Sequence, residues 1–555
     1  MFQGIEGTLI RYEEGKFSLS KKISLPSHQR CAVLKLCEVG WLYRQVHSFT
    51  EARSADQSYG LVGHSFVTAL REELTEYYRL LAGLETGVRE GAVSLLQLGV
   101  WTREPLARLK LLACLVTKVG EARGGALATV LYTHLSQGNP DLGSCVATLL
   151  SACCRPLYTM LLRWLLDGSL EDPYNEFFIN GDPNVQGEAI WHHKYSIRVA
   201  MIPRFLSLTW AKKILSTGKS INFLHSVCGD TGHVEGRAGV ISSLERMDPA
   251  TLFRGEVDNP LLETVGQLYN VTSRHVLDVM YGKFQLMSHL AALRKYMLLG
   301  QGDIMRYLLD LLDEELSHPA SDLYPHNLAG ILETAIRGTN TQFEDQEILE
   351  RLDVRLLEIQ AGDTGWDVFS LDYKVSGPIG VVFTPDIMTQ YLMLFNTLWR
   401  AKRMEWILSC SWKKLASLHK MARQLPELSP VLHLANLVAS EMIHFIHQMA
   451  YYTTFEVMEC GWDSLNKMIN TAESLDEIIS AHEEFLGTLV SRALLDDRSR
   501  DVLTQLRAIY DRILEFQTIA NRIHDDAVEE VRSFMIKSFS NDYFVSGRPG
   551  RPGSS

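Results

Sequence analysis

The chain has 555 residues, of which 46% are hydrophobic and 22% are charged, and its formal net charge is -12. A single hydrophobic core rarely serves so long a chain, so we expect two or more domains, and the composition excludes a largely disordered protein. The acidic balance argues against nucleic acid as the main ligand, because phosphate binding favours a basic surface.

Cysteine usage and hydropathy bear on the cellular compartment. The nine cysteines include no CxxC pair, which favours reduced thiols in the cytosol. The start of the chain, Met1-Phe2-Gln3-Gly4, lacks the basic and then apolar segments of a secretory signal. The closest approach to a membrane-spanning run, residues 106–119, is interrupted by Arg108, Lys110 and Lys118. We therefore expect an intracellular protein with no membrane segment.

Helical patterns dominate the first half of the chain. Residues 1–25 hold short apolar pieces separated by glycines and predict a small β element. From 28 to 225, apolar residues recur at intervals of three and four, as at Leu70, Leu74 and Tyr77, which predicts amphipathic helices. The stretch 228–258 has five glycines and few large apolar residues, so it predicts a linker between two domains.

The second half of the chain adds a strand to the helices. Apolar and polar residues alternate over 369–375, which predicts a strand, and residues 379–383 are predicted to return as its hairpin partner after Gly377-Pro378. Thr384-Pro385-Asp386 then predicts the start of a long helix. Another long helix is expected over 431–460.

Gly218-Lys219-Ser220 is the string that most suggests an enzyme. A phosphate-binding loop needs GxxxxGK[ST] after a strand. Here Lys213 stands where the first glycine belongs, and the residues before the string have a helical pattern. A nucleotide hydrolase is therefore a disfavoured alternative.

Glu441, His444 and His447 are spaced three apart and lie on one side of a predicted helix. A di-iron centre would need this pattern twice, together with further carboxylates, and no second copy occurs in register. We interpret the three residues as a polar stripe. No catalytic, cofactor-binding or metal-binding residues are predicted, so we expect the protein not to be an enzyme.

The segment Trp399-Arg400-Ala401-Lys402-Arg403-Met404-Glu405-Trp406 places three cations and two tryptophans on two helical turns. A buried side next to a solvated side would explain this pattern. A protein interface would explain it as well, because tryptophan and arginine are common anchors and an acidic partner would suit the cations. The pattern alone leaves both interpretations open.

Several long motifs carry a resemblance to a known family. They are Gly60-Leu61-Val62-Gly63, GKSINFL from Gly218, YMLLGQGD from Tyr296, GDTGWDVFSLDY from Gly362, WRAKRME from Trp399 and HFIHQM from His444. With these motifs in this order, the chain is similar to the γ-tubulin complex components, a GRIP-domain family, over about residues 1–530.

The resemblance implies a mostly α fold, with two stacked helical-bundle GRIP domains that form an elongated rod and a small β-hairpin in the second domain. The N-terminal domain, 1–227, would make lateral contacts between subunits. The C-terminal domain, 259–540, would bind γ-tubulin, and 541–555 would be a disordered tail. The extension that precedes these domains in the family and docks small accessory proteins is expected to be missing.

The resemblance also implies a function without a cofactor. The protein would be a structural subunit of a ring template for microtubule nucleation at centrosomes and spindle poles, in the cytoplasm and cytoskeleton. Its partners would be γ-tubulin, γ-tubulin complex component 2, other GRIP-domain subunits and, through the ring, the microtubule minus end. A helical tethering scaffold unrelated to γ-tubulin is the remaining alternative.

The expected contact residues fall into two groups. Lateral contacts between subunits are expected at Lys219, Asn222 and His225. Contacts with γ-tubulin are expected at Asp372, Tyr373, Lys374, Arg400, Lys402 and Arg403.

Overall fold

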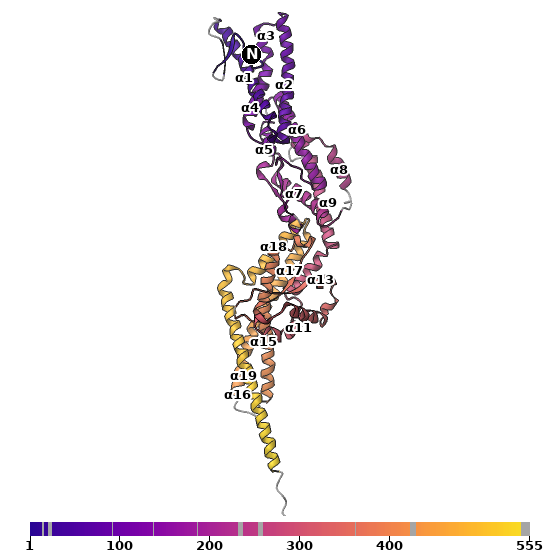
Figure 1. Cartoon of the computed structure of the whole chain (residues 1–555), viewed down its shortest axis with the longest axis vertical. Helices are drawn as coiled ribbons and strands as arrows, with labels where there is room; N and C mark the ends of the chain where they lie inside the picture. Colours follow the sequence, from indigo (N-terminus) through magenta and orange to yellow (C-terminus); the bar gives the residue numbers. More distant parts are fainter. Residues whose placement is uncertain are drawn as a thin grey trace, which may run out of the picture. The chain divides into compact units, whose positions relative to one another are not determined.

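The computed structural model describes residues 1–13, 16–19, 25–91, 93–136, 138–185, 187–230, 237–253, 259–360, 362–421 and 429–545. Its contacts divide the chain into two compact units: unit 1, Met1–Val276, and unit 2, Leu277–Ser555. Both units are built mainly from helices (Figure 1), which confirms the predicted mostly α fold class.

Unit 1 is a bundle of long helices. Helix α1 (Ser27–Ser54) packs against α2 (Gly60–Arg89) and α4 (Arg103–Val119), and α2 packs along α6 (Pro140–Asp167). Figure 1 shows α1, α2 and α4 lying alongside one another. The other elements are β1 (Ile10–Glu13), β2 (Lys16–Leu19), α3 (Leu95–Trp101), α5 (Gly124–Thr133), β3 (Ile179–Gly181), β4 (Tyr195–Ile197), α7 (Leu208–Ser226), α8 (Arg237–Arg246) and α9 (Pro260–Gly282), the last of which ends in unit 2.

Two small antiparallel strand pairs accompany the helices of unit 1. Strand β1 pairs with β2, with Ile10 opposite Leu19, which confirms the β element predicted near the start of the chain. Strand β3 pairs with β4, with Ile179 opposite Ile197. Each pair remains a separate two-stranded sheet among the residues that the structure describes.

Helix α6 corrects one expectation from hydropathy. Among the described residues it is the one helix that is long and apolar enough to cross a membrane, judged by length and composition alone. From the sequence, residues 106–119 were expected to come closest to a membrane-spanning run. Leu149, Cys153 and Trp164 of α6 are each 0% exposed, because they pack in the core of unit 1. Burial inside a helical bundle explains the apolar composition of α6.

The segment predicted to be a linker, 228–258, contains secondary structure. Helix α8 lies within it, and Leu244 of α8 is fully buried in the core of unit 1. The hydroxyl of Tyr158 donates a 2.5 Å hydrogen bond to the Leu244 carbonyl. The division between the units falls later, after Val276, so the predicted boundary is corrected. Residues 231–236 and 254–258 of the predicted linker lie outside the described residues.

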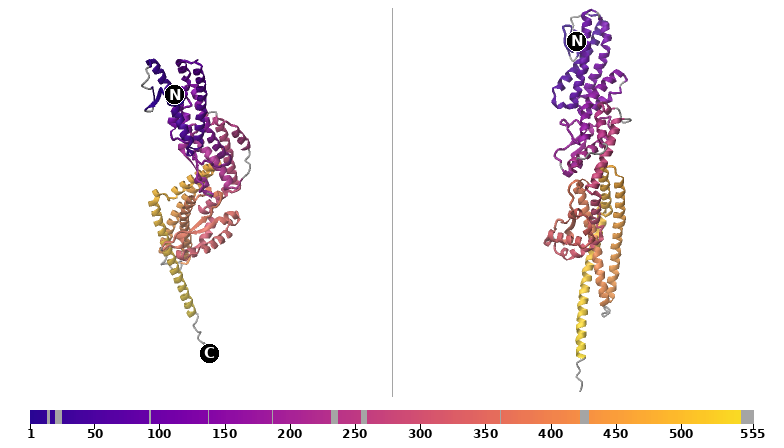
Figure 2. Two further views of the ribbon diagram at one scale, coloured as in Figure 1. Left: turned by 45° about the horizontal axis from the view of Figure 1, so that its top comes forward. Right: turned by 90° about the vertical axis from the view of Figure 1, so that its right-hand side faces the viewer.

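Unit 2 is organised around three long helices. Helix α15 (Pro385–Met421) packs along both α16 (Ser429–Tyr451) and α19 (Arg500–Val545), and Figure 2 shows these helices running along one another. The other elements are α10 (Leu286–Ala292), α11 (Gly302–Leu316), α12 (Pro325–Arg337), α13 (Gln346–Arg351), β5 (Leu352–Leu356), α14 (Gly365–Val368), β6 (Phe369–Tyr373), a π-helix (Tyr452–Glu459), α17 (Cys460–Thr471) and α18 (Leu475–Arg492).

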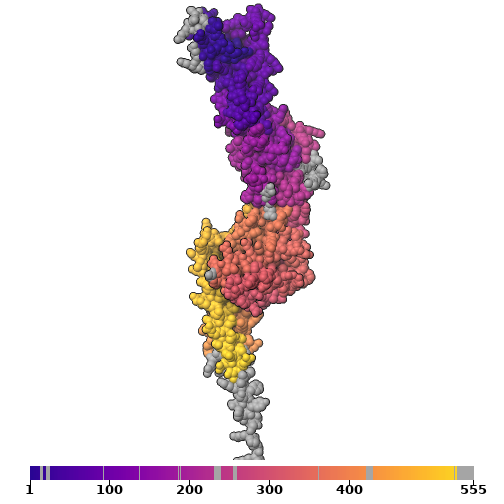
Figure 3. Space-filling view, in the orientation of Figure 1, coloured from indigo at the N-terminus to yellow at the C-terminus, as the bar shows by residue number. Residues whose placement is uncertain are grey.

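The ends of two predicted segments differ from the structure. The helix expected over 431–460 is α16 followed by the π-helix. Helix α19 continues to Val545, so the tail predicted from 541 is helical in its first five residues. Residues 546–555 lie outside the described residues. Figure 3 shows α19, in yellow, at the surface of unit 2, and its Val502, Ile509 and Ile519 are exposed.

The small hairpin of unit 2 is present, but its second strand was assigned wrongly. Strand β6 pairs with β5, which precedes it, and Val354 lies opposite Leu371. Residues 379–383, predicted to form the return strand, contain no strand, because Pro378–Val381 forms a 3₁₀-helix instead. The alternation of apolar residues in Leu352-Asp353-Val354-Arg355-Leu356 was the signal for the true partner.

Candidate interaction surfaces

The Gly218-Lys219-Ser220 string lies in the middle of helix α7, where the backbone N–H groups are used within the helix. A phosphate-binding loop needs free N–H groups that point at the ligand, so this geometry does not support a nucleotide site. Gly218 lies against the ring of Trp164, and a Cβ atom added to it would come within 2.0 Å of Trp164 Cε2. The glycine therefore permits the close packing of α7 on α6.

Of the three predicted lateral-contact residues, Lys219 belongs to this string, and Asn222 and His225 follow it on α7. Two of the three have contacts within unit 1. The side-chain amide of Asn222 donates a 3.2 Å hydrogen bond to the carbonyl of Gly168, just after α6. Lys219 Nζ lies 5.2 Å from the centroid of the Trp191 ring. His225 is exposed. Of the three residues, only His225 is fully available to another molecule.

The Gly60-Leu61-Val62-Gly63 motif begins α2 and receives a buried carboxylate. Glu176, 0% exposed, accepts hydrogen bonds from the N–H groups of Leu61 at 2.6 Å, Val62 at 3.0 Å and Gly63 at 3.4 Å. Burial raises the pKa of this carboxyl, although the three N–H bonds act in the opposite direction. Gly60, with φ +84°, leaves room for the carboxylate, because an added Cβ would lie 2.4 Å from Glu176 Cδ. No local pattern predicts this partner, because it lies 115 residues from Leu61 along the chain.

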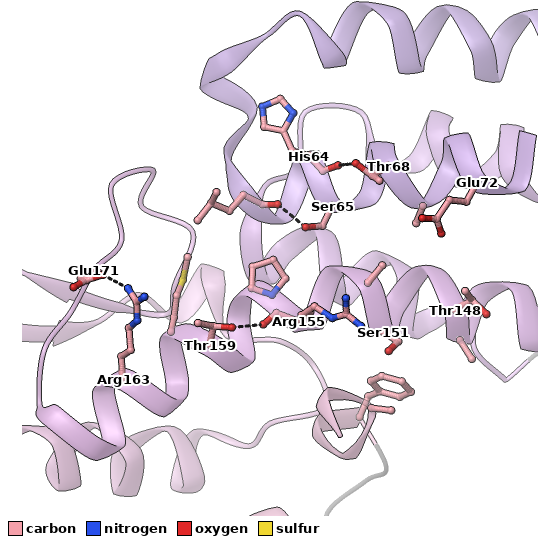
Figure 4. A pocket seen from close by; sticks show the side chains of 18 residues that line it. His64, Ser65, Thr68, Glu72, Thr148, Ser151, Arg155, Thr159, Arg163 and Glu171 are labelled. Carbon is pink, nitrogen blue, oxygen red and sulfur yellow. Dashed lines mark hydrogen bonds and ion pairs between the residues drawn. The ribbon is translucent and has the colours of Figure 1, made fainter. Parts of the chain in front are cut away.

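A groove of about 950 Å³ runs between α2 and α6 on the surface of unit 1. Figure 4 shows His64, Ser65, Thr68 and Glu72 on one wall and Thr148, Ser151, Arg155 and Thr159 on the other. Arg163 is engaged by Glu171 at one end. The walls consist largely of small side chains, so the groove could admit a side chain or helix edge of another protein, with Glu72 and Arg155 as charged contacts.

In unit 2, the Trp399 to Trp406 segment forms two turns of α15 and combines buried and accessible residues. Trp399 is 1% exposed and packs with Trp366, Phe369 and Phe395. Arg403 lies 4.3 Å from the centroid of the Trp366 ring, and burial lowers the pKa of its guanidinium to about 10. The buried interpretation of this pattern therefore holds for Trp399, while Arg403 is half-buried against Trp366.

Arg400 and Lys402 remain partly accessible on the same turns. Arg400 pairs with Asp367 at 3.7 Å, and Lys402 Nζ is 2.7 Å from Glu405. About two-fifths of each cationic side chain is exposed, 42% for Arg400 and 37% for Lys402. Both cations can therefore still meet an acidic partner.

The predicted contacts on β6 divide in the same way. Tyr373 is 1% exposed, and its hydroxyl shares a 2.6 Å hydrogen bond with His289 Nδ1, so this prediction of a contact residue is wrong. Its place in the alternation, two residues after the buried Leu371, accounts for the burial. Lys374 is exposed and paired with Asp353 across the strands, and Asp372 lies 3.8 Å from Arg355.

A second groove, of about 570 Å³, lies between α11, α15 and α16. Its rim includes Lys402, Trp406 and Trp412, and the indole N–H of Trp406 donates a 2.6 Å hydrogen bond to Asp310. Trp412 is 53% exposed. The sequence interpretation stopped at Trp406 and missed Trp412, although its spacing of six residues from Trp406 and the Lys413-Lys414 pair after it were visible.

Glu441, His444 and His447 are all exposed on α16. His447 also lines the second groove. Among the described residues, no group of three His, Cys, Asp or Glu side chains is placed to hold a metal ion.

The structure thus consists of two mainly helical units, each with a surface groove. Comparison with protein families makes this specific. A model described as "Gamma tubulin complex component N-terminal" matches residues 1–283, and one described as "Gamma tubulin complex component C-terminal" matches residues 286–544. The chain therefore belongs to the γ-tubulin complex component family, which confirms the resemblance carried by its motifs.

Comparison with individual relatives shows which members of the family the chain resembles. The chain is 47% identical to Gamma-tubulin complex component 3 of Homo sapiens over 96% of its own length and 60% of the relative. It is 34% identical to Spindle pole body component alp6 of Schizosaccharomyces pombe over 96% of this chain and 66% of the relative. Gamma-tubulin complex component 2 of Mus musculus is 28% identical over 83% of this chain and 53% of the relative. The chain thus spans 60% of the length of the human relative that it matches.

Proposed function

We propose that this protein is a structural subunit of the γ-tubulin complex that binds γ-tubulin and assembles laterally into a ring template for microtubule nucleation. The observation that supports this most is the 47% identity to Gamma-tubulin complex component 3 over 96% of the chain, across both units. The corresponding location is the cytoplasm and the microtubule organising centre, at centrosomes and spindle poles.

The proposed role requires positioning and no chemistry from this chain. A ring of γ-tubulins would hold the first αβ-tubulins in place and so remove much of the entropy cost of gathering them. GTP would belong to the tubulins. The helical setting of Gly218-Lys219-Ser220 supports this division, because it leaves no phosphate-binding loop at the string that most suggested one.

We place the γ-tubulin contact on unit 2, at the partly accessible cations Arg400 and Lys402 and the adjoining groove with Trp412. Exposed tryptophan next to cations is a frequent composition of interface hot spots. The sequence also suggested Tyr373 and Arg403 as contacts. Tyr373 is buried and Arg403 is stacked on Trp366, so we assign both a structural role beneath this surface.

Reversal of charge tests the γ-tubulin surface. In a pull-down with purified γ-tubulin, the double variant Lys402→Glu/Trp412→Ala should retain about 10-fold less γ-tubulin than wild type, because it removes one cation and one anchor. The matched control is Lys467→Glu, which reverses a charge on α17, outside this groove. Equal retention by the folded double variant and the control would remove this surface from the proposal.

We place the lateral contact on unit 1, at the groove between α2 and α6 and at His225. In co-purification with component 2, Arg155→Glu should reduce recovery of component 2, because it reverses the exposed cation of one wall. Arg71→Glu, an exposed change on α2 that does not line the groove, is the control. Recovery of γ-tubulin should be unaffected by either variant, and loss of component 2 with the control alone would refute this placement.

A further inference from the structure

Helix α3 of unit 1 has none of its seven residues buried. Its fold is nevertheless fixed at the start, because Ser94 and Gln97 form a capping box in which Ser94 N–H donates to Gln97 Oε1 at 2.8 Å. The helix contacts α1 and α4. Helix α3 is therefore fixed to the bundle, and most of its side chains are exposed.

The outward side chains are mostly large and apolar. Leu96 is 81% exposed, Val100 is 66% exposed and Trp101 is 57% exposed. Val88 near the end of α2 and Leu34 in α1 are also exposed. We call these five residues the tip patch. Large apolar side chains left exposed at one end of a bundle favour a binding site, and tryptophan is a frequent anchor in such sites.

Several cations lie at the same end of unit 1 as the tip patch. Helices α1 and α4 run parallel, with Glu38 paired to Lys110 and Gln45 bonded to Thr117, so the first turns of α1 lie where α4 begins. Exposed Arg30 and Lys35 on α1 therefore lie at the same end of the bundle as exposed Arg103 on α4.

The acids at this end of the bundle offset these cations only in part. Glu85 is paired with Arg89, and Glu104 is paired with Arg108. Glu90 is exposed at the end of α2 and forms no ion pair with another described residue. Among the described residues, this end of unit 1 thus has an excess of positive charge, although the whole chain carries -12.

The local positive charge indicates which kind of molecule is best suited to cover the patch. A second copy of the chain would bring like cations together. An anionic bilayer extends over much of the protein surface, so the net charge of -12 would oppose its binding. Recognition of anionic lipids also normally requires a denser basic cluster. A partner helix interacts mainly with charges within a Debye length of about 8 Å. The local cations would therefore dominate its electrostatic interaction with the patch.

We propose that the tip patch binds an amphipathic helix of a partner protein, with acidic residues on both sides of the helix's apolar stripe. Leu96, Val100 and Trp101 would receive the apolar anchors of that helix, and Arg30, Lys35 and Arg103 would meet its acids. The site is separate from the surfaces proposed for γ-tubulin and for lateral neighbours, so it does not depend on them.

The test uses the full chain and a fluorescent synthetic helix with leucines along one stripe and glutamates on both sides of it. The double variant Leu96→Asp/Trp101→Asp should bind this peptide at least about 10-fold more weakly than wild type. Val199→Asp is the matched control, because Val199 is 70% exposed on unit 1 and lies outside the patch. Thermal unfolding should be unchanged in both variants, since the altered side chains are exposed.

Two comparisons identify the source of binding. Arg103→Glu should weaken binding of the glutamate peptide, and high salt should weaken it in wild type. A peptide with lysines in place of the glutamates should bind much more weakly. Equal binding of both peptides, equal binding by the Asp/Asp variant, or binding only to vesicles of phosphatidylcholine and phosphatidylserine would overturn the proposal.

Discussion

At Gly218, the chain has no space for a side chain. The Trp164 ring that fills this space also donates a 2.8 Å hydrogen bond from Nε1 to the carbonyl of Ile214, so ring and helix are fixed together. The GKSINFL motif could be recognised from the sequence, and its helical setting was predicted from the residues before it. The reason for its glycine could not be predicted, because Trp164 is 54 positions away and contact across that separation leaves no local pattern.

Substitution of Gly218 tests this contact. Gly218→Ala should destabilise unit 1 by about 1–3 kcal/mol, because the new methyl group overlaps the indole of Trp164. Gly83→Ala on α2 is the control: nothing lies within 4 Å of its added Cβ, so the higher helix propensity of alanine should be neutral or stabilising. Thermal or urea unfolding measures both. Equal effects at the two glycines would contradict the packing role.

Buried histidine gives unit 2 a pH dependence. His482 is 0% exposed and shares a 2.9 Å hydrogen bond with the Tyr391 hydroxyl, and burial lowers its pKa to about 4. Because its pKa is lowered on folding, the neutral ring contributes stability that is fully present above the unfolded pKa of about 6.5 and is lost as pH falls toward 4.

Unit 2 should therefore lose stability on mild acidification. The contribution of His482 amounts to a loss on the order of 2 kcal/mol by about pH 5. The variant His482→Gln, which keeps a polar partner for Tyr391 but cannot titrate, should show a smaller fall in unfolding midpoint between neutral and acidic pH. Parallel falls in wild type and variant would show that His482 does not carry this dependence.

At the scale of elements, periodicity located the helices well and the strand pairing poorly. The start of α15 follows its Thr384-Pro385-Asp386 signal, and the Ile387 N–H lies 3.4 Å from Thr384 Oγ1. Strand β6 was also found. Its partner β5 was missed because the alternation in 352–356 is short and directly follows α13, and because Gly377-Pro378 offered a turn on the other side.

The prediction of a linker over 228–258 was wrong because it also rested on a local pattern. Its glycines suggested an open segment, but α8 buries Leu244, and α9 adds Leu261, Val265 and Leu268 to the same core. Few apolar residues are enough when one of them, Leu244, is fully buried and others pack partly buried against the same core. The composition of a segment does not reveal how much of its small apolar surface a neighbouring bundle covers.

Fragments test where unit 1 ends. A fragment of residues 1–283 should fold with a cooperative thermal transition, because it retains α8 and most of the residues that complete the core. A fragment of residues 1–227 should aggregate or melt well below it, since it exposes the surface that Leu244, Leu261 and Val265 cover. Circular dichroism and thermal melts compare the two. A stable 1–227 fragment would contradict the assignment of these helices to unit 1.

At the scale of the whole molecule, the sequence was sufficient to recognise the family, because six motifs occur in the right order along both units. It was less informative about surfaces. Two of the six suggested γ-tubulin contacts, Tyr373 and Arg403, are engaged inside unit 2, and two of the three suggested lateral contacts, Lys219 and Asn222, contact neighbours within unit 1. A motif marks a residue that matters, but packing and binding can require the same residue type.

The central claim is that this chain is a subunit that holds γ-tubulin in a lateral assembly. The most direct measurement is affinity purification of the tagged chain from its own cells, followed by quantitative mass spectrometry. The account predicts that γ-tubulin and component 2 are recovered in amounts comparable with the chain itself. Recovery of abundant, folded chain with other tethering proteins but without γ-tubulin or component 2 would contradict it.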